Sequence, residues 1–171
     1  MTNVEMEMEE VYEYPLAEKV NPNFRKCHDV TIWVKQNLES LVDDNDNTIF
    51  SKVNLGYSED KLKSFTKKAT CDVHINTVTF EDDFTYSRPE KINTIIVFKL
   101  KGNNNRVAET ATILLDYLIQ EFATNDTFKQ LTIDNKGIVS DTRITNAGIR
   151  EQPNNSNWYV LGVIELSHHL F

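Results

Sequence analysis

Two cysteine–histidine pairs are the residues of this chain that most resemble a metal site. Cys27 is followed directly by His28, and Cys71 lies three residues before His74. Thiolate and imidazole ligands together are typical of zinc sites. Neighbouring helical residues point about 100° apart, and strand residues three apart point to opposite faces, so neither pair suits one shared ion. We therefore interpret the thiols as free and mostly buried, and we predict no metal and no cofactor.

Patterns for other kinds of catalysis are also missing from the sequence. It contains no Gly-x-Ser-x-Gly nucleophile turn and no glycine-rich phosphate loop, and its five glycines are scattered. The Asp/Asn cluster from Asp43 to Asn47 lacks the glycine and the distal glutamate of an EF-hand calcium loop, so we interpret it as a solvated turn. We predict that the protein is not an enzyme and has no catalytic residues.

Charge disfavours a general nucleic-acid-binding surface. The 171 residues carry a net charge of -8 with a pI near 5.0. One lysine-rich segment resembles a basic strip, but nearby acids nearly neutralise it, and we interpret both charged groups as parts of a head-to-tail subunit interface. The two groups are Lys61, Lys63, Lys67 and Lys68, and Glu81, Asp82 and Asp83.

The sequence predicts no membrane contact. No apolar run approaches the length of a membrane span, and the first residues, MTNVEMEMEE, are acidic where a signal peptide is basic. We therefore expect a protein that is made and kept in the cytoplasm or assembles there.

The chain divides into an acidic N-terminal arm, residues 1–20, and a single α+β domain, residues 21–171. In the arm, apolar residues alternate with glutamates, which is compatible with a solvated segment or with an arm that docks extended on a neighbour. In the domain we expect two amphipathic helices and several strands, with a bulge near Asn76 in the second strand. The expected elements are helices Asn21–Val42 and Arg106–Ala123 and strands Thr48–Tyr57, Cys71–Phe80, Ile92–Leu100, Ile138–Thr145 and Trp158–Phe171, with a long turn before the last strand.

The last strand is the longest and carries the main functional expectation. At about 3.4 Å per residue it spans roughly 45 Å, about the width of a whole domain of this size. We therefore expect the strand, or its hairpin, to project past the core and to present unpaired backbone groups to another copy of the chain. Its outward-facing positions are too apolar for water and are our candidate subunit contact: Tyr159, Leu161, Val163 and Glu165.

These elements predict an α+β fold. Strands that follow one another are joined by connections too short for parallel crossovers, so we expect a mainly antiparallel sheet. Two helices on one face would leave the other face for solvent or a partner.

In element order and in the final run Asn157–Leu166, the chain resembles the tail terminator, or tail completion, proteins of long-tailed bacteriophages. The resemblance covers nearly everything after Asn21 and rests on order and pattern. It implies a non-enzymatic virion protein of the tail or neck that forms a homohexameric ring on the tail tube. Such a ring ends tube polymerisation, meets the tail tube protein on one side and a head-completion or connector protein on the other, and lets DNA pass through its lumen.

Two alternatives stay open. The first is a neck or head-closure adaptor of the same virion. The second, from a different class, is a small cytoplasmic α+β enzyme or ligand-binding domain.

Overall fold

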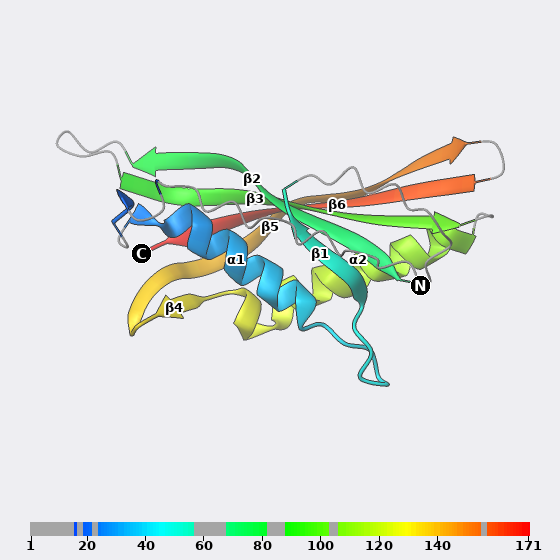
Figure 1. Ribbon diagram of the computed structural model, residues 1–171, viewed down its shortest axis with the longest axis horizontal. Helices are drawn as coiled ribbons and strands as arrows, with labels where there is room; N and C mark the ends of the chain where they lie inside the picture. Colours follow the sequence, from blue (N-terminus) through cyan, green and yellow to red (C-terminus); the bar gives the residue numbers. More distant parts are fainter. Residues whose placement is uncertain are drawn as a thin grey trace, which may run out of the picture.

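The computed structural model describes residues 16, 19–21, 24–56, 68–81, 88–102, 106–154 and 157–171. These residues form two layers, helices against one sheet (Figure 1). The elements are α1 (Lys26–Glu39), β1 (Phe50–Leu55), β2 (Ala69–Glu81), β3 (Arg88–Gly102), α2 (Arg106–Thr124), the 3-10 helix η3 (Asp126–Phe128), β4 (Leu131–Ile133), β5 (Lys136–Asn154) and β6 (Asn157–Leu170). The predicted α+β class is confirmed.

The sheet is mainly antiparallel, as predicted, and its strand order is β1-β2-β3-β6-β5-β4. The exception is the pair β1 and β2, which run parallel, with Val53 opposite Cys71. The expectation that consecutive strands pair only antiparallel is therefore wrong for this pair. The predicted bulge in β2 is confirmed, since the register shifts between Ile75 and Thr77.

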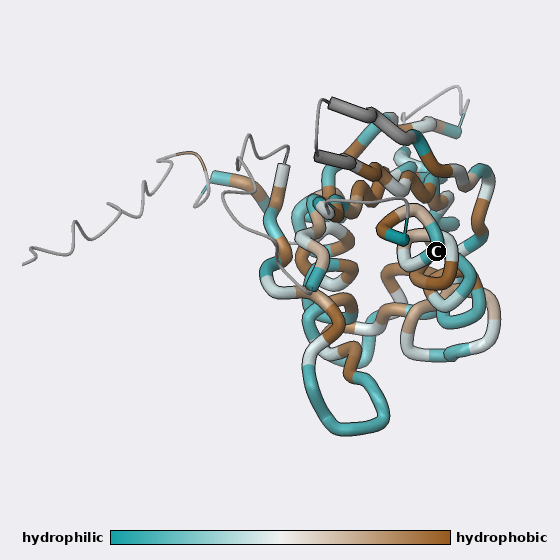
Figure 2. The backbone as a smooth tube through the Cα atoms, turned by 90° about the vertical axis from the view of Figure 1, so that its right-hand side faces the viewer, coloured by the Kyte–Doolittle hydropathy of each residue, from teal (hydrophilic) through white to brown (hydrophobic). Residues whose placement is uncertain are grey.

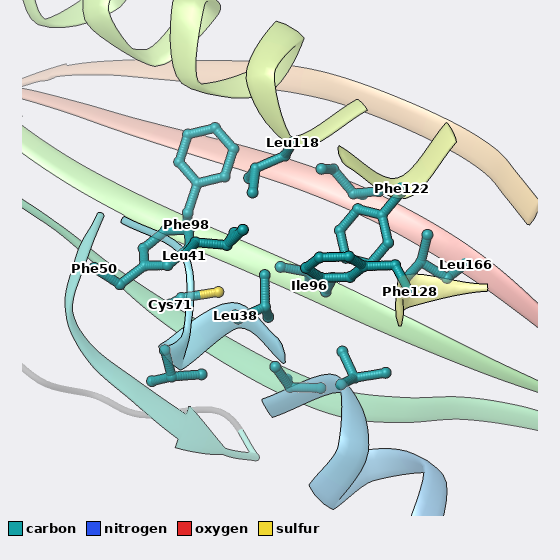
Figure 3. Packing of buried hydrophobic residues seen from close by; sticks show 14 of the residues in the cluster. Leu38, Leu41, Phe50, Cys71, Ile96, Phe98, Leu118, Phe122, Phe128 and Leu166 are labelled. Carbon is teal, nitrogen blue, oxygen red and sulfur yellow. The ribbon is translucent and has the colours of Figure 1, made fainter. Parts of the chain in front are cut away.

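Both helices lie on one face of the sheet, and the core lies between the two layers (Figure 3). The ring of Trp33, on α1, meets His168 of β6 at a centroid distance of 5.8 Å, and Phe122 of α2 meets Phe128 at 4.7 Å. The helical side of this core contains Val30, Val34, Leu38, Ala111, Leu118 and Phe122, and the sheet side contains Cys71, Val73, Ile92, Ile96, Phe98, Leu100, Val160, Ile164 and Leu166.

The first helix is shorter than predicted at both ends. It begins at Lys26, because the N–H of Phe24 donates to the carbonyl of Asn21 at 2.8 Å and forms a separate turn before the helix. Beyond the helix, the carboxylate of Asp43 accepts the backbone N–H groups of Asn45 and Asn47, both at 2.9 Å. These bonds hold the polar loop that Figures 1 and 2 show extending from the body between α1 and β1, and they lower the pKa of Asp43.

The second half of the sheet differs from the prediction. The strand β5 continues to Asn154, through the residues predicted to form a long turn, and pairs with β6 to that point. The strand β4 was not predicted; it joins β5 through Asp134 and Asn135, whose φ angles of 50° and 62° give a tight hairpin turn. Figure 1 shows the paired ends of β5 and β6 rising away from α2, and the projecting hairpin stays a prediction.

The expected overhang of unpaired backbone on the last strand is wrong. β6 lies in the middle of the sheet, with β3 paired to it from Trp158 to His169 and β5 from Asn157 to Leu170. The long strand fits because β3 and β5, with 15 and 19 residues, are both longer than β6, which has 14. Among the described strands, the unpaired edges belong instead to β1, β2, β4 and β5.

Candidate interaction surface on the helix-free face of the sheet

The face of the sheet turned away from both helices is the candidate functional site, and we call it the open face. The strand register shows which residues lie on the open face. One row across the sheet runs from Asp72 of β2 through Val97 of β3 and Val163 of β6 to Gly148 of β5. Because strand side chains alternate, every second residue from this row shares the face. Its central members are Asp72, His74, Ile95, Val97, Lys99, Leu161, Val163, Glu165, Asn146, Gly148 and Arg150.

The centre of the open face is apolar. Ile95 and Val97 on β3 lie beside Leu161 and Val163 on β6, and all four side chains are half-buried within the single chain. Four aliphatic side chains in a two-by-two block form a contiguous patch on a sheet face that no described helix covers. Such a patch is typical of a contact surface.

A buried ion pair flanks this patch. The ammonium group of Lys99 lies 2.9 Å from a carboxylate oxygen of Asp72, and their side chains are only 11% and 1% exposed. The side-chain amide of Asn54, on β1, donates to the other oxygen of Asp72 at 3.0 Å. Removing two charges from water is costly unless they are paired and hydrogen-bonded. The side chains of Asp72, Lys99 and Asn54 must therefore keep this arrangement in the folded chain. The sequence analysis missed the pair, because only the β2–β3 register brings the two residues together.

The other flank has a hollow of about 150 Å³. It lies over Gly148, whose missing side chain leaves open space, and its lining includes Val163, Glu165 and Arg150. An apolar floor between an acid and a base suits a side chain with an aliphatic stem and a polar end.

The structure places three of the predicted interface residues together. Leu161, Val163 and Glu165 lie at alternate positions on the open face, while the side chain of Tyr159 lies outside what the structure describes. From the charged groups, Lys61, Lys63, Lys67, Asp82 and Asp83 fall outside the described residues.

The two remaining charged residues are separated by the length of β2. Lys68 precedes the strand and its ammonium group donates to Thr48 at 3.3 Å. Glu81 is the last residue of the strand and pairs with Arg88 at 3.2 Å. The structure therefore does not bring these two residues to the apolar patch, and the head-to-tail interface formed by the charged groups stays a prediction.

The second cysteine–histidine pair is arranged as the sequence indicated. Cys71 points into the core opposite Phe98, whereas His74 lies opposite Ile95 on the open face. Burial, and secondarily the carboxylate of Asp72, raises the pKa of the Cys71 thiol well above its usual range, so the sulfur stays protonated and is a poor nucleophile. Both cysteines are free thiols.

A buried polar cluster around His168 was not predicted. The hydroxyl of Thr142 lies 3.3 Å from the carbonyl of Lys129 and 2.9 Å from His168 Nδ1. A carbonyl only accepts, so this hydroxyl donates to Lys129 and accepts from Nδ1–H. Nε2 then accepts from the hydroxyl of Thr94 at 2.8 Å. Burial, and secondarily His169, lowers the pKa of His168 to about 4, so the imidazole is neutral at pH 7.

A scan against models of protein families found no match, and a search of curated proteins found none either. Within the described ranges, no three His, Cys, Asp or Glu side chains are grouped to hold a metal ion. No helix in the described part of the chain is long and apolar enough to span a membrane.

Proposed function

We propose that this protein is a structural virion subunit that forms a ring on the tail tube of a long-tailed bacteriophage. In this role it ends tube polymerisation and provides the surface to which the filled head is joined, and it has no catalytic activity. The ring is a homohexamer, and DNA passes through its lumen without specific binding. The element order helix, strands, helix and long terminal hairpin supports the proposal, since it follows the pattern of the tail terminator proteins that the sequence resembles.

The observation that carries the proposal is the apolar patch on the open face. Ile95, Val97, Leu161 and Val163 form a block on a rigid sheet whose other face is already covered by two helices. Rigid, preorganised surfaces lose little conformational entropy on association. The hollow over Gly148 gives this surface a specific contour, which favours a complementary protein partner over nonspecific hydrophobic association.

Charge substitution in the patch tests the proposal. Leu161→Glu combined with Val163→Glu should abolish assembly with the tail tube protein, because two carboxylates would be buried without partners in the interface. Ile113→Glu is the matched control, since Ile113 is 63% exposed on α2, away from the open face. Gly148→Arg is a second variant, because its side chain enters open space and blocks the surface without disturbing the fold.

Size-exclusion chromatography with light scattering, with and without tail tube protein, and incorporation into particles are the measurements. Melting followed by circular dichroism shows that each variant is folded. Unchanged incorporation of folded patch variants would refute the interface. A wild-type chain that stays monomeric even with tail tube protein would refute the ring, and assembly with head connector protein alone would favour the neck adaptor.

A further inference from the structure

The outer edge of β5 is the longest unpaired strand edge in the described part of the sheet. β4 pairs with β5 only from Lys136 to Val139, and no described strand pairs with the outer side from Ser140 to Asn154 (Figure 1). Fifteen residues at about 3.3 Å each give an edge of roughly 50 Å. Unpaired N–H and C=O groups along such an edge are a template for an added strand.

The two faces of this edge differ in chemistry. Arg143 and Arg150 are seven residues apart and would point to opposite faces of a regular strand. The bulge at Thr145 adds one residue to β5 and brings both arginines to the same face. They pair with Ser167 and Leu161, which are six residues apart on β6, so both lie on the open face. Both are exposed, although Arg143 also bonds to Asp141 at 2.8 Å.

The helix-side face of the same edge is apolar. Ile144, Ala147 and Ile149 are half-buried there and pack against the core. An added strand that matches this edge therefore needs acidic side chains on one face and apolar side chains on the other.

The N-terminal arm has this alternation. Apolar and acidic residues alternate strictly from Val4 to Glu9, and Glu10 and Val11 then interrupt the alternation. Glu7 and Glu13 share one face of an extended chain with the six-residue spacing of the two arginine positions. We propose that the arm of a second copy adds to the outer edge of β5 as an antiparallel strand, with Glu7 beside Arg150 and Glu13 beside Arg143.

We assign the arm to another copy because the proposed ring needs contacts between copies. The first turn of α1 lies beside the β4–β5 turn, since Lys26 and Asp29 line one hollow with Asp134 and Lys136. The chain that leads into α1 is thus anchored at the end of β5 whose outer side β4 already occupies. The free part of the edge begins beyond β4, and the cross-linking below distinguishes the arm of a neighbour from the arm of the same copy. This inference rests on the proposed self-assembly and identifies a second contact within it.

Cysteine cross-linking between two different full-length chains tests the arm contact. One chain carries Val11→Cys and the other Asn146→Cys, an exposed position between the two arginines. A disulfide-linked dimer of the two chains forms under mild oxidation only if the arm crosses between copies. Cys27→Ser is introduced in every chain, and Ile113→Cys on exposed α2 replaces Asn146→Cys in the control for chance encounters.

The expected result is a mixed dimer well above the Ile113→Cys control. Reversing both arginines of the acceptor to glutamate should lower the yield about tenfold, and reversing Glu7 and Glu13 of the donor to lysine should restore it. A cross-link confined to single chains that carry both cysteines would overturn docking on a second copy. Normal assembly with cross-linking no greater than the control would overturn the arm contact and leave the proposed ring intact, whereas absence of any assembly would overturn both.

Discussion

The buried imidazole of His168 should make the fold sensitive to mild acid. Above about pH 6.5 the group is neutral in both the folded and the unfolded chain. Burial lowers its folded-state pKa from 6.5 to about 4. Between these two values the unfolded chain binds a proton that the folded chain excludes, so the free energy of unfolding falls as the pH falls.

The size of the effect follows from the pKa difference. A shift from 6.5 to about 4 corresponds to about 3 kcal/mol of stability lost by pH 4, and the steepest slope is about 1.4 kcal/mol per pH unit. This is a large share of the stability of an ordinary domain. The folded chain has little means of accepting the charge, because both ring nitrogens already bond to neutral threonine hydroxyls.

Urea unfolding between pH 4 and pH 7 measures how the free energy of unfolding changes with pH. His168→Gln keeps a donor and an acceptor but cannot titrate, so its stability should fall less steeply with acid than that of the wild type. His28→Gln is the control, since the side chain of His28 is 73% exposed and its replacement should leave the slope unchanged. Parallel pH profiles for the wild type and His168→Gln would refute the reasoning.

Three further changes test other parts of the structure. Gly162→Ala should destabilise the fold by about 3 kcal/mol or more, because its Cβ would clash with the buried ring of Phe98. Gly148→Ala meets nothing within 4 Å and should be neutral; equal melting temperatures for the two variants would contradict this packing. Lys99→Met should cost about 3–5 kcal/mol by removing the ammonium group that pairs with the buried carboxylate of Asp72. Adding Asp72→Leu should recover part of the loss, which chemical unfolding of the single and double variants would show. Deleting Met1–Lys19 should leave the melting temperature of the domain nearly unchanged, because the core pattern begins after the arm; a large fall in that temperature would show that the arm is integral to the fold.

Hydrophobic periodicity predicted the buried elements well. The second helix was predicted at Arg106–Ala123 and runs to Thr124, because its apolar stripe is long and unbroken. The prediction failed where local turn signals conflicted with strand pairing. A long turn was predicted before the last strand, yet β5 continues through Gly148 and Pro153 in that region. It has no described partner on its outer side there, and an edge strand tolerates a proline that lacks an N–H.

The candidate site was predictable only in part. Period-2 alternation correctly assigned Leu161 and Val163 to the face away from the helices, because alternation depends on the strand alone. Which strands lie on either side of β6 depends on long-range register, so the sequence did not reveal that the strand is central. The pair formed by Asp72 and Lys99 was missed for the same reason.

The central position of β6 also bears on how the chain folds during synthesis. β3 and β5 are not neighbours, and only β6, which is made after both, joins them. Before β6 pairs, no described strand joins β3 to β5, and the edges of both strands that face β6 are unpaired. The contacts that close the sheet link Lys91–Gly102 to Trp158–His169, and pairings so distant in sequence are slow to form. We therefore expect the pairing of β6 with β3 to be a slow step in folding.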